Sequence, residues 1–403
     1  MSTQSFFVPT PPPKTKLGNH RQLAPLAGIH VSPICLGAMS VGDNFKLLDA
    51  FYDAGGNFID TANNYQDETS EQFIGEWMER RQNRDQMVIA TKYTSNFKRA
   101  ADLSQKTSYV GNNIKSLHVS VEQSLKKLRT DYIDILYVHW WDWTCGVEEV
   151  MNGLHHLVAQ GKVLYLGVSD TPAWIVSRAN MYARLTGKTP FVRDFERDII
   201  PMARVEGMAL APWNVLAGGK IRTDAEEERR RQTGEKGRTI MSADWERTPE
   251  ERKVCQVLEK VAAETGATSI TVMQKTPYVF PIVGGRKVEH LMDNIGALDI
   301  ALTPEQIAEL EAVKPFAKGF PHDMVVRILF CPGCVRAQAK FGCATAGRRV
   351  DILAIPFAGA EPRQVALSAG DPANEAVSGS VVERTVLVER REWGHLIAHL
   401  YVN

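Results

Sequence analysis

Between residues 30 and 300, short apolar runs alternate with longer segments whose apolar residues recur at helical spacing. The runs predict strands at 30–39, 57–62, 87–93, 134–139, 163–169, 208–213 and 279–285. The longer segments predict helices at 44–54, 70–83, 112–129, 146–160, 172–187, 194–206, 249–265 and 288–298. Such alternation is typical of a parallel sheet with helices outside it, and apolar strands suit burial on both faces. The sequence therefore predicts an α/β fold.

The number of strands favours a closed barrel. Seven strands are clear, and the spacing leaves room for an eighth between helices 172–187 and 194–206. Only the run KTPFV, residues 188–192, is found there. Eight strand–helix units predict a (β/α)8 TIM barrel with its sixth strand cut short. A doubly wound open sheet is the alternative, but the segment GAMSVG after the first strand does not fit the dinucleotide fingerprint of that fold.

Polar residues stand where predicted strands end. Asp60, Lys92, His139 and Ser169 each lie at or near the C-terminal end of a different strand. In a barrel these ends converge on one face, where the loops build active sites. Tyr65 follows Asp60 by five residues, which carries it off the strand and over that face. We therefore expect one polar site at this face.

These residue types suit the protonation of a carbonyl oxygen while a hydride arrives at the carbon. A lysine ammonium lowers the pKa of a nearby tyrosine from its ordinary value of about 10, because it favours the phenolate. Tyr65 is then the acid, Lys92 its activator, Asp60 the anchor of the lysine, and His139 the residue that orients the carbonyl. Each alone has a plain structural explanation, as a cap, a packing residue or a core residue. Their convergence favours a catalytic site.

The overall composition favours a small-molecule substrate. The net charge is zero, which argues against nucleic acid or an anionic membrane as the main partner. No apolar run approaches the length of about 18–20 residues that spans a membrane. Six irregularly spaced cysteines suit reduced thiols, so we expect a cytoplasmic protein. The oligomeric state stays open.

The chain divides into three regions. Residues 1–29, rich in proline near their start, are predicted to form an N-terminal arm, and residues 30–324 to form the barrel. Residues 325–403 differ in composition, with eight Arg, one Lys and half of the cysteines, and we expect an atypical, disordered tail. The tail contains CPGC at 331–334, Cys343, His395 and His399, but a full zinc pattern is absent, so no metal is expected. The charged run 224–238 is predicted to be a solvated helix and loop.

The segments FIDTANNY, IATKY, DILYVHWWD and YLGVSD resemble the signature segments of the aldo-keto reductases. The similarity extends over about residues 16–324 and is greatest to fungal aryl-alcohol dehydrogenases and norsolorinic-acid-reductase-like enzymes. It implies an (α/β)8 barrel that uses NADPH/NADP+ to reduce aromatic aldehydes or ketones to alcohols, reversibly, in secondary metabolism. The family's catalytic Asp, Tyr, Lys and His fall on Asp60, Tyr65, Lys92 and His139.

The resemblance also implies cofactor contacts. The family's Ser-Asn pair falls on Ser169 and Asp170, where the aspartate lacks the amide donor. PWNVLAGGKI, residues 212–221, resembles the loop that closes over the pyrophosphate, and GGRKVEHLMDN, residues 284–294, resembles the segment that holds the adenosine end and its 2′-phosphate. The implied cofactor-binding residues are Asp60, Ser169, Asp170, Pro212, Trp213, Leu216, Gly218, Lys220, Gly284, Arg286, Lys287 and Asn294. Trp140, Trp141 and Trp143 are expected either to wall an aromatic substrate pocket or to pack in the core.

Three departures from the family stand out. Strand six lacks about ten residues, among them a Tyr-Gln pair whose aromatic ring stacks on the nicotinamide, and about two helical turns are missing before strand eight. The resemblance ends at residues 319–324. These losses suggest a mispredicted gene model or a degenerate copy, and a lost strand would leave ladder hydrogen bonds unpaired on both neighbours.

Two other functions stay open. A catalytically impaired, nicotinamide-binding regulatory protein would explain the shortened strand six. A different barrel enzyme, such as a hydrolase, is the second, and the GGRK segment speaks against it.

Overall fold

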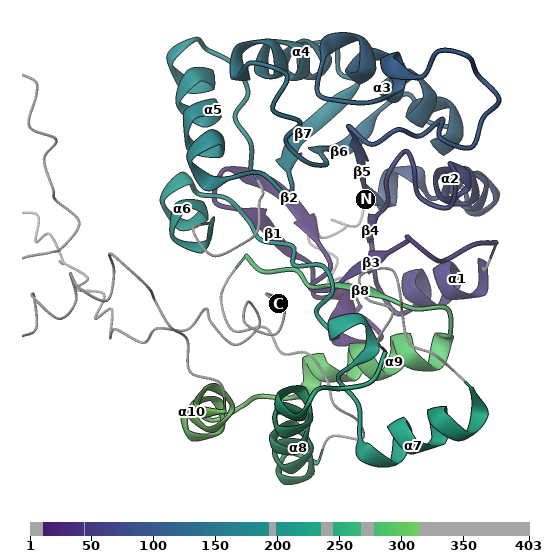
Figure 1. Ribbon diagram of the computed structural model, residues 1–403, viewed down its shortest axis with the longest axis vertical. Helices are drawn as coiled ribbons and strands as arrows, with labels where there is room; N and C mark the ends of the chain where they lie inside the picture. The colour runs from purple at the N-terminus through teal and green to yellow at the C-terminus, as the bar shows by residue number, and fades with distance from the viewer. Residues whose placement is uncertain (1–10, 44, 193–198, 235–244, 267–277, 314–403) are drawn as a thin grey trace, which may run out of the picture. The chain divides into compact units, whose positions relative to one another are not determined.

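The computed structural model describes residues 11–43, 45–192, 199–234, 245–266 and 278–313. Within them, six strands form a parallel sheet in the order β7-β6-β5-β4-β3-β8 (Figure 1). The strands are β3 (Cys35–Gly37), β4 (Phe58–Asp60), β5 (Val88–Tyr93), β6 (Ile133–Val138), β7 (Val163–Val168) and β8 (Ile282–Gly284). Each neighbouring pair is parallel, which confirms the predicted α/β class. The predicted tail, 325–403, lies outside the described residues, together with its cysteines and histidines.

The helices of the described part are α1 (Phe45–Asp53), α2 (Thr69–Arg81), α3 (Ile114–Leu128), α4 (Val147–Ala159), α5 (Ala173–Leu185), α6 (Ile199–Glu206), α7 (Asp224–Thr233), α8 (Pro249–Glu264), α9 (Val288–Gly296) and α10 (Pro304–Ala312). Most of the helices follow the predicted periodicity, while α7 lies in the charged run 224–238 and α10, after the last strand, was not predicted. Helix α4 is representative, because it buries Val147, Val150, Met151 and Leu154, which share one face at helical spacing. None of these helices is long and apolar enough to cross a membrane.

The shortened sixth strand contributes one residue that hydrogen-bonds to both neighbours. The amide of Val192 donates to the carbonyl oxygen of Leu166 in β7 at 2.9 Å, and the carbonyl of Val192 accepts from the amide of Ala209 at 2.9 Å. Val192 and its neighbour Phe191 are buried. The ladder bonds expected to be lost beside strand six are therefore made at this position, and that expectation is wrong there.

Further backbone hydrogen bonds lead from Ala209 to β3, the first strand of the sheet along the chain. The amide of Leu210 donates to the carbonyl of Tyr278 at 2.8 Å, and the amide of Phe280 donates back to Leu210 at 2.9 Å. The amide of Cys35 in β3 then donates to the carbonyl of Pro281 at 3.0 Å. Because the sheet's two edges are linked in this way, the hydrogen bonds close the sheet into a ring.

A hairpin begins within the region predicted as an arm, 1–29, and ends at Val31, inside the predicted first strand 30–39. Strands β1 (Arg21–Ala24) and β2 (Ala27–Val31) pair antiparallel. Their buried side chains belong to one apolar cluster with the first residues of the parallel strands, which include Cys35, Phe58 and Val88. The hairpin thus packs at the N-terminal ends of the strands. The C-terminal ends are left for the polar residues.

Candidate functional site

A buried ion pair joins the ends of β4 and β5. Asp60 is the last residue of β4 and is in register with Ala90, so Lys92 lies two residues further along β5. The Lys92 ammonium reaches back to Asp60 Oδ1 at 2.6 Å and donates to the carbonyl oxygen of Thr61 at 2.7 Å. Burial alone would lower the pKa of Lys92, but the charge of Asp60 and the contact with Tyr65 outweigh it and raise that pKa. Lys92 is therefore an ammonium at neutral pH.

Tyr65 lies between the lysine and a histidine. Its ring centroid is 4.9 Å from Lys92 Nζ and 5.8 Å from the ring of His139, which it meets edge to face. Burial raises the pKa of Tyr65, Lys92 opposes this, and the charge of Asp60 adds to it, so the pKa lies above its usual value. The expected lowering by Lys92 is present but is outweighed. Tyr65 thus holds its proton at neutral pH and can donate it.

His139 follows β6 and is neutral. Burial, with the charge of Lys92, lowers the pKa of His139 to about 3. Ser95 Oγ lies 3.3 Å from His139 Nδ1 and accepts a hydrogen bond from Trp140 Nε1 at 3.1 Å. Because the hydroxyl oxygen accepts from the indole, its own proton is free to be donated to Nδ1, and this arrangement corresponds to the tautomer protonated at Nε2. Ser95 was not predicted from the sequence.

The predicted carboxamide-binding pair follows β7 on the same face. The amide of Ser169 donates to the carbonyl of Val138, the residue before His139, at 2.8 Å. Asp170 has a left-handed backbone, with φ +41°. Burial raises the pKa of Asp170, and the charge of Lys92 opposes that shift. The structure thus brings Ser169 and Asp170 close to the four predicted catalytic residues.

The segment 284–294 begins level with Asp60. Gly284 pairs with Gly37, which in turn pairs with Asp60, so the three lie in line across β8, β3 and β4. Arg286 and Lys287 follow, are exposed, and directly precede helix α9. Downstream in α9, the side-chain amide of Asn294 donates to the carbonyl of His290 at 2.6 Å.

The loop 212–221 runs beside β8, because the carbonyl of Pro212 accepts from the amide of Ile282 at 2.8 Å. Gly218 has φ +62° in a tight turn that follows Leu216. Trp213 is 38% exposed. Lys220 does not join the buried site, since its ammonium lies 3.1 Å from both carboxylate oxygens of Glu251 in α8.

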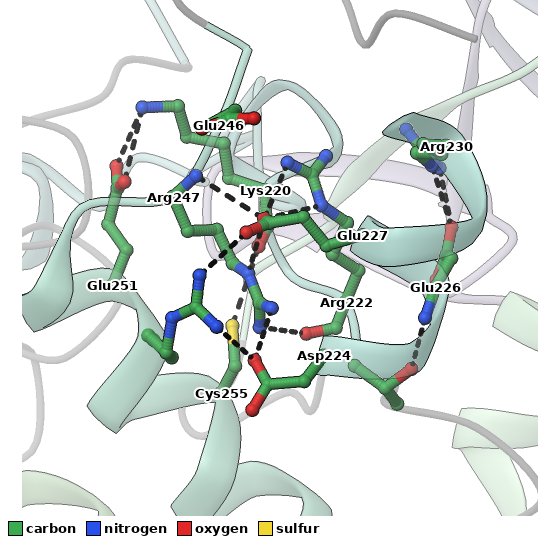
Figure 2. Close-up of polar contacts among 12 residues, drawn as sticks. Lys220, Arg222, Asp224, Glu226, Glu227, Arg230, Glu246, Arg247, Glu251 and Cys255 are labelled. Carbon is green, nitrogen blue, oxygen red and sulfur yellow. Dashed lines mark hydrogen bonds and ion pairs between the residues drawn. The ribbon is translucent and has the colours of Figure 1, made fainter. Parts of the chain in front are cut away.

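A buried charge network lies directly beyond this loop (Figure 2). The Glu227 carboxylate accepts hydrogen bonds from Arg222 at 2.9 Å and from Arg247 at 2.8 Å, and the three side chains are almost completely buried. Arg222 also donates to the carbonyl of Gly219 at 2.9 Å. Burial raises the pKa of Glu227, but the two arginines outweigh it and lower the pKa to about 2. The run 224–238, predicted as solvated, thus begins with a buried anchor; residues 235–238 lie outside the described part.

The three tryptophans after His139 differ in environment. Trp141 is buried in the core, while Trp143 is 65% exposed and lies 6.3 Å, ring to ring, from Trp174 in α5. Trp140 binds Ser95, as described above. One of the three thus packs in the core, and the others lie by the strand ends.

Comparison with known proteins shows the family of this chain. The aldo/keto reductase family model matches residues 33–315. The chain is 65% identical to an aryl-alcohol dehydrogenase [NADP(+)] of Phanerodontia chrysosporium, over 79% of this chain and 91% of that protein. It is 50% identical to norsolorinic acid reductase A of Aspergillus parasiticus, over 78% of this chain and 86% of that protein. It is also 53% identical to a putative aryl-alcohol dehydrogenase of Saccharomyces cerevisiae, over 79% of this chain and 93% of that protein. The chain belongs to the aldo/keto reductase family.

Proposed function

We propose that this protein uses NADPH to reduce aromatic aldehydes or ketones to alcohols, reversibly. The observation that carries the proposal is the buried contact of 2.6 Å between Lys92 and Asp60, with Tyr65 beside Lys92. The names of the relatives, aryl-alcohol dehydrogenase [NADP(+)] and norsolorinic acid reductase, support both the cofactor and a role in secondary metabolism. A small-molecule substrate and a cytoplasmic location complete the proposal, supported by the zero net charge and the free cysteines Cys35, Cys145 and Cys255.

The residues along the strand ends suit a phosphorylated dinucleotide. Gly285 has open space where a side chain would stand, and Arg286 and Lys287 present two exposed cations before the N-terminus of α9. This donor set suits a phosphate, and an arginine fork suits the 2′-phosphate of NADPH. Ser169, with Asp170, would hold the carboxamide end. When bound, NADPH supplies the hydride.

The chain's own residues supply the proton and the orientation. Tyr65 donates its proton to the carbonyl oxygen, because its raised pKa keeps it protonated until charge develops on the substrate. Lys92 stabilises the phenolate that remains, and Asp60 holds the ammonium in place. Neutral His139 donates from Nε2 to the same oxygen, which fixes the direction of the carbonyl.

The shortened elements remain part of the proposal. The alignment with the Phanerodontia chrysosporium relative spans 352 positions, whereas 79% of 403 residues is about 318 residues. About 34 aligned positions thus have no counterpart in this chain, which supports the proposal that it has lost residues that the relative contains. A nicotinamide-binding protein with impaired turnover is therefore the second candidate function.

Two measurements separate these functions. Fluorescence titration with NADPH tests binding, and NADPH oxidation with benzaldehyde tests turnover. Tyr65→Phe should abolish turnover and keep binding, while Tyr52→Phe, a tyrosine on α1, should change neither. Equal rates for Tyr65→Phe and the wild type would refute the mechanism. Binding without turnover in the wild type would favour the impaired protein.

A further inference from the structure

The turn between Tyr65 and helix α2 has an unusual backbone. Gln66, Asp67 and Glu68 are all left-handed, with φ of 51°, 51° and 80°. None is glycine, and in this region the Cβ of an L-residue crowds the backbone, so such residues normally occur singly. Three in succession need surrounding contacts that hold them.

Glu68 ends this turn, and two lysines bind its carboxylate. Oε1 lies 2.6 Å from Lys98 Nζ, and Oε2 lies 3.2 Å from Lys127 Nζ. Lys98 follows strand β5, and Lys127 is in the last turn of α3, which packs on α2 (Figure 1). The Glu68 side chain is only 15% exposed, so solvent screens these ion pairs little.

Lys127 also binds the chain on the other side of Tyr65. Its ammonium donates to the carbonyl oxygen of Asn63 at 3.1 Å, and the amide of Asn63 donates to the carbonyl of Lys92 at 3.1 Å. One buried ammonium thus contacts the segment both before and after Tyr65. Through Asn63, this segment is also hydrogen-bonded to β5, the strand that carries Lys92.

Glu71 supplies the opposite charge. Its Oε2 lies 2.8 Å from Lys127 Nζ, and its Oε1 accepts from the hydroxyl of Thr91 at 2.6 Å. Glu71 is fully buried, and Thr91 directly precedes Lys92. The positive charge of buried Lys127 and the negative charge of buried Glu71 therefore neutralise each other inside the protein.

We propose that Lys127 is a positioning residue for the proton donor: with Glu68 and Glu71 it holds the left-handed turn that fixes Tyr65 over the strand ends. This inference rests on the proposed function, in which Tyr65 is the acid. Lys127 contacts Asn63, Glu68 and Glu71, and it would act through the backbone on either side of Tyr65. Its removal should loosen residues 63–70 and leave the proposed cofactor residues in place.

The first test is hydrogen exchange on the full chain without cofactor. Lys127→Met removes the charge and keeps the length of the side chain. Peptides that span residues 63–70 should exchange at least about tenfold faster than in the wild type, because local opening sets the rate. Lys126→Met is the matched control, since Lys126 is the exposed neighbour on the same helix. Unchanged exchange in Lys127→Met would overturn the proposal whatever the activity.

The second test compares kcat with cofactor binding. In Lys127→Met, kcat with benzaldehyde should fall by about 10- to 100-fold, because a misplacement of about 1 Å costs that much. The NADPH dissociation constant should stay unchanged, whereas a general loss of structure would alter both. Faster exchange with an unchanged kcat would overturn the positioning role. A wild type without turnover would refute the proposed function, and the exchange comparison would still decide this inference.

Lys98→Met covers the case in which Lys127→Met does not fold. Lys98 is 25% exposed and binds Glu68 alone in this cluster, so its loss removes one of two contacts. Exchange of residues 66–70 should rise and kcat should fall, each by less than in Lys127→Met. If Lys98→Met changes neither, the proposal fails.

Discussion

The ammonium of Lys92 and the carboxylate of Asp60 lie 2.6 Å apart, and both side chains are almost completely buried. Removing one partner leaves the other charge without compensation, which destabilises a protein by about 3–5 kcal/mol. We expect a loss of this size in Asp60→Asn, measured by urea unfolding. Asp43→Asn, which alters an aspartate far less buried than Asp60, should change stability little. Equal stability of Asp60→Asn and the wild type would show that the pair contributes nothing to folding.

Lys92→Met should affect chemistry more than binding. Without the ammonium nothing opposes the rise in the pKa of Tyr65 that burial and Asp60 cause, and the phenolate is no longer stabilised. We expect kcat to fall by about 10²–10⁴-fold, the usual contribution of a proton-transfer group. Steady-state kinetics with benzaldehyde measure this, and Lys115→Met, an exposed lysine on α3, is the control. A kcat within error of the wild type would remove Lys92 from the mechanism.

The low pKa of His139 predicts how stability depends on pH. The folded protein holds His139 neutral with a pKa of about 3, whereas an unfolded histidine titrates near about 6.5. Between these pH values the histidine binds a proton in the unfolded state and not in the folded state. The stabilising contribution of neutral His139 is therefore present above about pH 6.5 and is lost as the pH falls towards 3. The slope from this group is at most about 1.4 kcal/mol per pH unit. Urea unfolding at several pH values should show a shallower dependence for His139→Gln, and parallel curves would contradict the assignment.

Ser95 should set the tautomer of His139. Its hydroxyl lies between Trp140 Nε1 and His139 Nδ1. Ser95→Ala removes this hydroxyl. We expect both neutral tautomers then to be populated, so that the Nε2–H donor is present only part of the time. We expect a lower kcat with an unchanged NADPH dissociation constant. ¹⁵N NMR of the imidazole should show the change in tautomer directly, and a single Nε2–H tautomer in the variant would refute this role.

The sequence predicted those parts of the fold that rest on local periodicity. Helices such as α3 and α4 and the ends of β4 and β5 follow from apolar spacing, and the meeting of Asp60 with Lys92 follows from the parallel strands. The hairpin β1–β2 was not predicted, because its strands are short. The residues between them, Pro-Leu at 25–26, are also not a typical hairpin-turn pair such as Asn-Gly.

Other features depend on contacts between distant segments. Ser95 is a lone serine in a loop, and only the fold brings it to His139. In the sequence, Glu227 is one of many charged residues in a run predicted to be solvated. In the structure it is buried and accepts a hydrogen bond from Arg247, twenty residues away. Such tertiary pairings leave no local pattern in a single sequence.

Arg286 and Lys287 should discriminate between the two nicotinamide cofactors. Both are exposed before helix α9, and a 2′-phosphate carries negative charge that NADH lacks. Arg286→Ala with Lys287→Ala should raise the NADPH dissociation constant by about tenfold or more, since two charged contacts are lost, and leave that of NADH unchanged. Lys253→Ala, an exposed lysine on α8, is the control in fluorescence titration. An equal loss for both cofactors would place the phosphate elsewhere.

The Glu227 network should hold the loop that precedes α7. Glu227→Gln keeps the shape but removes the countercharge of buried Arg222 and leaves Arg247 paired with Asp224, at 2.6 Å. An uncompensated buried charge such as that of Arg222 costs about 3–5 kcal/mol locally. Limited proteolysis should then cut faster within 212–234, while Glu228→Gln, on the exposed side of α7, should not differ from the wild type. The folded pKa of about 2 means that this contribution is present above the ordinary glutamate value and is lost as the pH falls towards 2. Equal cleavage of both variants would contradict the anchor.

Substitutions of Val192 test whether its two backbone hydrogen bonds stabilise the closed sheet. Its amide and carbonyl bond to Leu166 and Ala209, at 2.9 Å each. Val192→Pro removes the amide donor and leaves the carbonyl of Leu166 without that bond, which costs about 1–3 kcal/mol beyond the lost side chain. Val192→Ala is the matched control, because it shortens the side chain and keeps the amide. Urea unfolding should therefore rank the wild type above Val192→Ala and Val192→Ala above Val192→Pro. If the two variants unfold at the same concentration, the backbone bond at strand six does not support the barrel, and the impaired binding protein becomes the better account of this chain.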